Sequence, residues 1–378
     1  MMPRTSGFET AFQCVDCRAC DEVCPFYLAS GSVEYGPWSK VKAVQGILLG
    51  SRDVSDVLGE LYSCACCGTC SNVCPAGVRV DELVRAARAM AVERGLVPEG
   101  IARMCKSIIE TGSIAGKPEA WGLWLPGGRL GPERGEYAYA CGCMVALRMG
   151  EIGRAALALM EAAGLKTVAL GRDERCCGLP LLDHGYGDEL RGIAERNTLA
   201  VEERGARVLV TECPACYTMY RHFYPRLYRE PRYRVLHTVD VLHDLVHSGK
   251  LRPSREIRVK AAFLDPCHYA KRDKRYDIPR GLLESIPGLK LVELSRSRDT
   301  GYCCGISGGT KLMFRDLVDR ASLLILEDAR RAGASVVVTA CPACTYQLSS
   351  AARRFEVRDV SVANLTALLA EACGINAR

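Results

Sequence analysis

The 378-residue sequence has no run of 18 or more apolar residues, the length at which a helix can span a membrane. Its first residues, Met1–Gly7, lack the apolar core of a secretory signal. An excess of one charge is also missing, because 50 Lys and Arg residues face 44 Asp and Glu residues, a formal net charge of +6. This mild balance gives no reason to expect nucleic acid or an anionic membrane as a partner. We expect a cytoplasmic protein that reaches a membrane only through a partner subunit.

The composition is otherwise that of a globular protein, with 48% hydrophobic and 25% charged residues. The length predicts two or three domains. The unusual feature is cysteine, which occurs 22 times. Thiols stay reduced in the cytoplasm, so clustered cysteines there indicate metal ligands more often than disulfides.

Two runs near the N-terminus follow the pattern C-x2-C-x2-C-x3-C-P. They are Cys14, Cys17, Cys20 and Cys24 before Pro25, and Cys64, Cys67, Cys70 and Cys74 before Pro75. This is the bacterial-ferredoxin run for a 4Fe–4S cubane, in which the fourth cysteine ligates the other cluster when two are present. We therefore expect one cubane on Cys14, Cys17, Cys20 and Cys74, and the other on Cys64, Cys67, Cys70 and Cys24. Zinc is the alternative, but zinc sites usually show C-x2-C pairs separated by a longer gap.

The residues around these runs predict helices. Apolar residues recur at helical spacing over 38–49 and again over 80–93. This favours a mostly helical ferredoxin-type module over a compact βαβ one, and we assign it residues 1–98, followed by a linker over 99–132. The linker contains Trp121–Pro126, for which core packing is a simpler explanation than docking of a partner.

The rest of the chain contains one cysteine pattern twice. A single cysteine is followed after 32 or 35 residues by Cys-Cys-Gly, and after a further 35 or 36 by Cys-Pro-Ala-Cys. The first set is Cys143, Cys176, Cys177, Cys213 and Cys216, and the second is Cys267, Cys303, Cys304, Cys341 and Cys344. Their offset of about 125 residues indicates an internal duplication. We expect one domain over residues 133–250 and another over 251–378.

Short strand-like runs alternate with amphipathic helices in both halves. The runs are 137–140, 167–170, 208–211, 259–264, 290–294 and 336–339, and the helices include 152–163, 189–204 and 311–331. Such alternation predicts parallel sheets, which bind ligands beyond the carboxyl ends of their strands. Each cysteine group follows a strand, so loops that are distant in sequence can converge on one site.

With these motifs the sequence resembles the cysteine-rich CCG family, and the order of its parts resembles the D-type subunits of the heterodisulfide reductase family. The resemblance covers nearly the whole chain. It implies a multidomain α/β fold, in which an N-terminal α-helical ferredoxin-type module is followed by two duplicated Rossmann-like α/β CCG domains. It also implies two 4Fe–4S cubane clusters and one or two noncubane 4Fe–4S clusters, each of the latter held by a five-cysteine set.

Within the first set, Cys141 and Cys143 compete for the same position. Gly142-Cys143-Met144 resembles the opening motif of the family, so we take Cys143 as the ligand. The plainer alternatives for each set are an ordinary cubane with a spare thiol, or a structural zinc. Adjacent cysteines such as Cys303 and Cys304 offer zinc no advantage.

The resemblance implies an iron–sulfur oxidoreductase subunit that passes electrons through the cubanes to the ten CCG cysteines, its catalytic ligands. There a disulfide would be reduced to thiols, or the reverse. The competing function is an electron-transfer subunit of a flavin-dependent glycolate, lactate or glycerol-3-phosphate dehydrogenase, which shares this architecture. Two complete five-cysteine sets favour the disulfide reaction.

No flavin or nicotinamide fingerprint is evident in the sequence, so electrons are expected to enter or leave through another subunit. That partner would be a membrane cytochrome b-type protein or a soluble flavoprotein. The other expected partner is a small-molecule or protein disulfide or thiol.

Some residues beside the cysteines carry weaker signals. His268 follows Cys267 and His184 lies near Cys177, where a proton donor would assist disulfide cleavage. A loop histidine without a catalytic role is nevertheless the simpler explanation for both. The run Lys271–Arg275 could attract an anionic substrate, although a charge run usually forms a solvated face.

Gly305, Gly308 and Gly309 do not have the spacing of a dinucleotide fingerprint. They fit better as positions where backbone N–H groups approach cluster sulfurs. Four cysteines fall outside both patterns, namely Cys66, Cys105, Cys141 and Cys373. Of these, Cys105 and Cys373 lie in helical apolar patterns and fit core packing.

Overall fold

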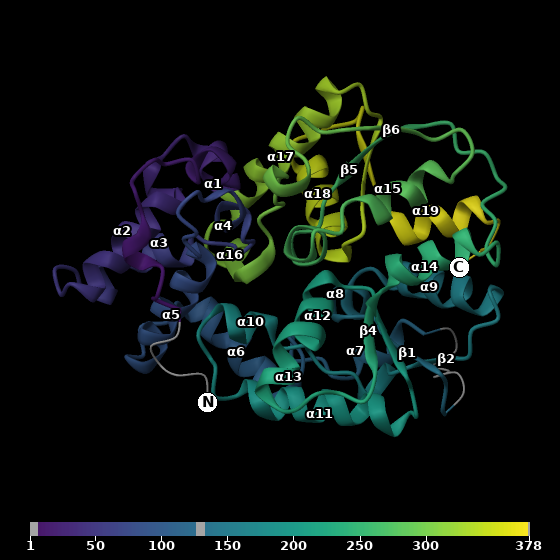
Figure 1. Ribbon diagram of the computed structural model, residues 1–378, viewed down its shortest axis with the longest axis horizontal. Coiled ribbons are helices and arrows are strands. Elements are labelled where there is room, and N and C mark those ends of the chain that lie inside the picture. The colour runs from purple at the N-terminus through teal and green to yellow at the C-terminus, as the bar shows by residue number, and fades with distance from the viewer. Residues whose placement is uncertain (1–6, 126–132, 377–378) are drawn as a thin grey trace.

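The computed structural model describes residues 7–125 and 133–376. A helical module at the N-terminal end packs against two α/β domains, each built on one parallel sheet (Figure 1). The predicted fold class is thereby confirmed. Within the described residues, no helix is long and apolar enough to cross a membrane.

The regular elements of residues 7–125 are helical, as predicted. The α-helices are α1 (Pro25–Ser30), α2 (Pro37–Leu48), α3 (Leu58–Tyr62), α4 (Thr69–Val73), α5 (Val80–Glu93), α6 (Glu99–Thr111) and α7 (Ala120–Leu123). Short 3-10 turns join them: η1 (Ala11–Gln13), η2 (Asp21–Val23), η3 (Val33–Tyr35) and η4 (Val54–Val57). Pro25 opens α1, where its missing N–H is not needed, so Cys24 stands at the N-cap and leaves its loop in a fixed direction.

Each of the remaining halves forms a four-stranded parallel sheet. The first has the order β2-β1-β3-β4, with β1 (Tyr137–Ala140), β2 (Thr167–Ala169), β3 (Val208–Thr211) and β4 (Arg234–His237). The second has the order β6-β5-β7-β8, with β5 (Lys260–Leu264), β6 (Lys290–Val292), β7 (Val336–Thr339) and β8 (Ser361–Asn364). The sequence predicted three strands per sheet and missed β4 and β8. Both are half-buried edge strands of mixed polarity, so their apolar pattern is weak.

Helices flank both sheets. In the first domain they are α8 (Cys143–Leu147), α9 (Gly150–Ala162), α10 (Leu179–Asp183), α11 (Leu190–Glu203), α12 (Pro214–Thr218), α13 (Tyr224–Leu227) and α14 (Thr238–His247), with η6 (Gly171–Asp173) and the π-turn η7 (Met219–Phe223). In the second they are α15 (Asp277–Glu284), α16 (Thr310–Met313), α17 (Arg315–Arg331), α18 (Pro342–Arg354) and α19 (Leu365–Ala372), with the π-turn η8 (Cys267–Lys271), η9 (Arg298–Thr300) and η10 (Ser307–Gly309). The predicted helix 311–331 is broken at Phe314, whose φ of −124° and ψ of 50° are not helical.

The two α/β domains pack through equivalent elements. Helix α14 of the first contacts α15 of the second, and α19 of the second contacts α9 of the first. The contact between α12 and η8 is likewise repeated by α18 and α8. Reciprocal contacts of this kind are those of an approximate two-fold pair, so the duplication seen in the sequence is also a duplication in space.

The ferredoxin-type module packs on both domains. Helices α5 and α6 contact α10 of the first domain, whereas α1 contacts α17, and α4 contacts η8 and η9, of the second. One hydrophobic cluster contains both Cys24 and Phe26 of the module and Cys303 and Val318 of the second domain. The second domain therefore shares a core with the ferredoxin-type module.

Candidate metal centres

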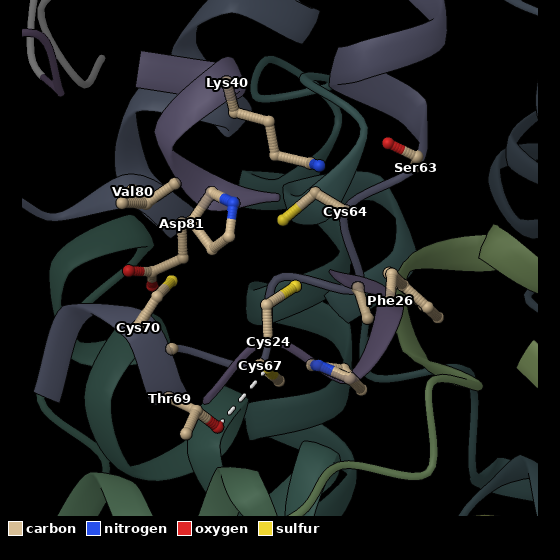
Figure 2. Close-up of a pocket in the computed structure, with 14 residues that line it drawn as sticks. Cys24, Phe26, Lys40, Ser63, Cys64, Cys67, Thr69, Cys70, Val80 and Asp81 are labelled. Carbon is tan, nitrogen blue, oxygen red and sulfur yellow. Dashed lines mark hydrogen bonds between the residues drawn. The ribbon is translucent and has the colours of Figure 1, made fainter. Parts of the chain in front are cut away.

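Four cysteines of the ferredoxin-type module line one pocket (Figure 2). They are Cys24, which precedes α1, and Cys64, Cys67 and Cys70 of the second run, and they line a small cavity of about 20 Å³. These are the four thiols that the run pattern assigns to one cubane. Cys24 joins the cysteines of the second run because α1, which begins after Cys24, runs from the first run towards the second.

The other ferredoxin cysteines lie nearer the surface. Burial raises the pKa of Cys20 to about 12, with smaller contributions from Asp21 and from the neighbouring thiols Cys74 and Cys14, so three cysteines of this predicted set interact. Cys17 is exposed. A group held here would lie at the surface of the molecule.

In the first α/β domain, the five cysteines lie in the segments that follow β1, β2 and β3, with Cys143 at the start of α8 and Cys216 inside α12. The thiols of Cys176 and Cys216 shift the pKa of Cys177, and those of Cys177 and Cys213 shift the pKa of Cys143. Strands β1 and β3 are neighbours although β2 separates them in sequence, which is the switch point where parallel sheets bind ligands.

The second α/β domain repeats this arrangement. Cys304 Sγ lies 3.1 Å from Cys344 Sγ, and the neighbouring thiols of Cys267 and Cys304 raise the pKa of Cys303. Cys344 in turn interacts with Cys341. The loops after β5, β6 and β7 thus bring all five predicted cysteines together.

The strand register bears on the choice between Cys141 and Cys143. Ala140 is paired with Thr211, and its equivalent Leu264 with Thr339. Cys143 and Cys267 each lie three residues beyond these equivalent strand ends, whereas the equivalent of Cys141 is Asp265. The geometry therefore supports Cys143.

One cysteine in each set differs from the others in its acidity. Hydrogen bonds from Cys176 and Cys216 hold the pKa of Cys177 well below its usual range. Hydrogen bonds from Cys303 and Cys344 do the same for Cys304. The lowered pKa of the second residue of each Cys-Cys pair favours its deprotonated form, which is the form that binds metal.

The two kinds of cysteine site meet at one contact. Cys67 of the second ferredoxin run packs against the cluster that contains Cys303 of the second α/β domain, and each thiol shifts the pKa of the other. The sequence patterns treated these residues as parts of separate modules. Only the docking of α4 on η8 and η9 brings them together.

Backbone N–H groups approach several of these sulfurs. Gly305 N–H donates to Cys303 Sγ at 3.4 Å, and Gly305 adopts a φ of 78° that favours glycine. Cys344 N–H donates to Cys341 Sγ at 3.4 Å. Convergent thiols that accept N–H bonds form a donor set suited to iron–sulfur clusters. Within residues 7–125 and 133–376, no group of three or more His, Cys, Asp and Glu side chains is arranged to hold a single metal ion.

The histidines and tryptophans that the sequence marked only weakly are all buried. His268 is buried, and burial lowers its pKa to about 3, so its imidazole is neutral at pH 7. His184 is buried and stacks on Tyr62 of the ferredoxin-type module, with ring centroids 5.8 Å apart. Trp121 and Trp124 are buried, as the core-packing explanation expects, while Pro126 lies outside the described residues.

The charge run after Cys267 is not simply a solvated face. Lys271 is buried, Lys274 pairs with Asp299, and Arg275 donates to Asp240 Oδ1 at 2.9 Å. Arg272 instead lines a pocket of about 250 Å³, where Cys67 and Cys267 also lie.

The four cysteines outside the two patterns are buried or partly buried. Cys105 is fully buried in the core, and Cys373 is partly buried against it, in agreement with the packing expectation. Cys66 is buried 3.5 Å from Arg88 Nη1. Cys141 is also buried, and its Sγ lies 3.5 Å from Gly142 O.

Sequence reasoning missed three buried charged groups near the cysteines. Arg88 and Lys40 are buried on helices of the ferredoxin-type module. Their signal was present, because each is a cation at an apolar position of a predicted helix. Glu174 accepts N–H bonds from Cys141 at 3.0 Å and Gly142 at 2.7 Å, and burial raises its pKa to about 7.

Comparison with known proteins agrees with this geometry. The cysteine-rich CCG domain family matches residues 137–221 and 261–349, and the 4Fe-4S dicluster domain family matches residues 10–78. The B-type subunit of fumarate reductase (CoM/CoB) from Methanothermobacter marburgensis is 30% identical, over 94% of this chain and 71% of that protein. The chain belongs to the CCG family of iron–sulfur oxidoreductase subunits.

Another relative of this CCG-family chain extends over nearly its whole length, and a solved structure shares its fold. The D-type subunit of dihydromethanophenazine:CoB–CoM heterodisulfide reductase from Methanosarcina barkeri is 28% identical, over 96% of this chain and 94% of that protein. A hypothetical protein from Helicobacter pylori shares the fold at a TM-score of 0.50 and 9% identity, over 80% of this chain and 59% of that structure.

Proposed function

We propose that this chain passes electrons from a reduced partner subunit to a disulfide, or in the reverse direction. The disulfide R–S–S–R′ would take up two electrons and two protons, its S–S bond would break, and two thiols would leave. Iron–sulfur clusters, when bound, supply transfer of single electrons. The observation that supports the proposal most is the contact between Cys67 and Cys303, which joins the ferredoxin-type module to a CCG site.

The cysteines divide among these roles as their surroundings suggest. One cubane would be held by Cys14, Cys17, Cys20 and Cys74, the other by Cys64, Cys67, Cys70 and Cys24, and each five-cysteine set would hold a noncubane cluster. The domain limits proposed from the sequence place the cubanes in residues 1–98 and the five-cysteine sets in 133–250 and 251–378. Cys177 and Cys304, whose pKa values are lowered by their neighbouring thiols, would be ligands of these CCG groups.

The pocket beside Cys267 offers a small molecule access to the second CCG site. Its two acidic residues are already engaged, because Asp81 is paired with Arg85 and Asp273 with His222. Arg272 lines the same pocket, and its only ring or ion contact among the described residues is with the ring of Phe223. We infer that the pocket favours substrates that carry an anionic group.

The partner subunit would dock at the first ferredoxin run. Cys17 is exposed there, and the neighbouring side chains of Phe12 and Val15 are 59% and 66% exposed. An apolar surface around an exposed cluster ligand suits a protein that must approach closely enough to exchange electrons. The chain would be cytoplasmic, and such a partner would bring it to a membrane.

A second candidate function is supported by one relative. EtfAB:quinone oxidoreductase of Syntrophomonas wolfei is 27% identical, over 80% of this chain and 45% of that protein. By this likeness the chain would relay electrons for a flavin-dependent dehydrogenase and would bind no disulfide.

An assay with a chemical electron donor separates the two functions without the partner. The anaerobic, iron-replete protein is mixed with reduced benzyl viologen, and oxidation of the dye is followed after a disulfide is added. Disulfide reduction predicts dye oxidation that is lost in Cys304→Ser and retained in Cys373→Ser, which alters a cysteine outside both patterns. Iron-replete protein that leaves the dye reduced with every disulfide tested would favour the relay function.

A further inference from the structure

Lys271 is a buried cation that forms no ion pair with a carboxylate in the part of the chain that the structure describes, although its charge also acts on Asp299. The residue is only 1% exposed. The ammonium donates to Thr69 Oγ1 at 2.7 Å, Gly301 O at 2.5 Å and Tyr302 O at 2.9 Å, so all three N–H bonds are used. A buried charge is costly unless a charge of opposite sign compensates it. The protein therefore keeps a positive charge here for some negative group.

The ammonium lies between two cysteine sites. On one side, the Thr69 hydroxyl that it contacts is 3.5 Å from Cys67 Sγ. On the other side, Tyr302 directly precedes Cys303 in the sequence. The positive charge interacts with both Cys67 and Cys304, one thiol from each site. Lys271 thus lies where the ferredoxin-type module meets the second CCG site.

The duplication provides an internal comparison. Lys271 is four residues after Cys267, and the residue four after Cys143 is Leu147. Two residues before the Cys-Cys pair, the first domain has the buried Glu174 and the second has Gly301. The two CCG domains therefore have the same five cysteines but differ in buried charge at these equivalent positions. At these positions, the second domain has a buried cation and the first does not.

We propose that Lys271 is a positioning residue that makes the second CCG set the electron acceptor for the ferredoxin-type module. A fixed positive charge in a low-dielectric interior stabilises the more negative, reduced state of any group nearby. Lys271 would raise the reduction potentials of the groups held by Cys24, Cys64, Cys67 and Cys70 and by the second CCG set. The first CCG set would have the lower potential of the two. This rests on the proposed cluster sites and does not require that the substrate be a disulfide.

The test is a redox titration of the iron-replete protein followed by EPR, with the CCG signals assigned by Cys176→Ser and Cys303→Ser. Lys271→Gln keeps N–H donors for the carbonyl oxygens and removes the charge. It should lower the midpoint potentials of the two groups beside it and leave those of the first ferredoxin run and the first CCG set unchanged. Lys271→Arg should restore them. Lys274→Gln, a matched control in an exposed ion pair, should change none.

If the Lys271→Gln protein loses iron, two further measurements still test the role of Lys271. Lys271→Met provides a second uncharged variant, and the wild-type protein alone should show the second CCG signal at a higher potential than the first. The inference is overturned by wild-type potentials in the opposite order, or by an iron-replete uncharged variant with unchanged potentials. A wild-type protein that reduces no disulfide but shows the predicted shifts would contradict the proposed function and leave the role of Lys271 intact.

Discussion

Cys67 packs against the hydrophobic cluster that contains Cys303, and each thiol shifts the pKa of the other, although one belongs to a ferredoxin run and the other to the second CCG pair. The contact exists because α1 packs on α17 and α4 packs on η8 and η9. Both residues are expected metal ligands, so two redox groups held there would be neighbours. This proximity is what an electron-carrying subunit requires.

Cys303 is predicted to be essential for disulfide reduction. Cys303→Ser should abolish viologen-dependent disulfide reduction while the signals of the ferredoxin-type module remain, because the serine oxygen is a poor ligand for iron. Cys105→Ser, in the core away from both patterns, should retain the activity of the protein that still folds. Full activity in an iron-replete Cys303→Ser protein would mean that electrons reach the substrate without the second CCG site.

Arg88 is predicted to be essential for stability. Its guanidinium is buried and donates to Leu61 O at 2.7 Å, Cys64 O at 2.7 Å and Asp183 O at 2.8 Å. Arg88→Met would leave three buried carbonyl oxygens without this donor and should lower the free energy of unfolding by about 3 kcal/mol or more. Urea unfolding followed by tryptophan fluorescence measures the loss. Arg103→Met, at a side chain 76% exposed, is the control and should change little.

His237 is predicted to make the fold sensitive to acid. Burial lowers its pKa to about 3, whereas an unfolded histidine titrates near 6.5, so the unfolded chain binds the extra proton first. The contribution of His237 to stability is therefore complete above about pH 6.5 and declines as the pH falls, by about 1.4 kcal/mol per pH unit.

The second domain suggests the variant that tests this. His237 Nδ1 accepts an N–H bond from Val239 at the start of α14, and Asn364 accepts the equivalent bond from Thr366 at the start of α19. His237→Asn should keep the cap and remove the proton uptake. Urea unfolding between pH 7 and pH 5 should then depend less on pH in the variant. Equal dependence in both proteins would contradict the prediction.

Arg272 is predicted to select anionic substrates. A charge-assisted hydrogen bond contributes about 1.5–3 kcal/mol, so Arg272→Gln should raise the KM for a dicarboxylate disulfide about tenfold or more. The KM for a neutral disulfide should stay the same. Lys274→Gln lies two residues further on and serves as the control. A similar loss for both disulfides would assign Arg272 a structural role only.

The sequence predicted which cysteines come together, because strands that alternate with helices bring their carboxyl ends to one edge. It also predicted six of the eight strands at nearly their observed positions. The edge strands β4 and β8 were not predicted, because their half-buried residues of mixed polarity give only a weak apolar pattern in the sequence. The break in the predicted helix at Phe314 was not predicted, because the apolar repeat of the sequence continues across it.

The burial of Lys271 was a feature that the sequence could not predict. Lys271 stands in a run of charged residues that resembles a solvated surface, and only the approach of Thr69 and Tyr302 buries it. The contact of Cys67 with Cys303 likewise depends on how two modules dock. Local spacing contains no information on either event.

The central claim is that the CCG cysteines hold groups that bind sulfur from a substrate. It is tested most directly by anaerobic iron and sulfide analysis combined with EPR, before and after a thiol is added to the oxidised protein. We expect about 16 iron atoms per chain, from four four-iron clusters, and a new paramagnetic signal when the thiol binds. A full iron content with no signal altered by any thiol or disulfide would contradict the account and make the chain a relay between other proteins.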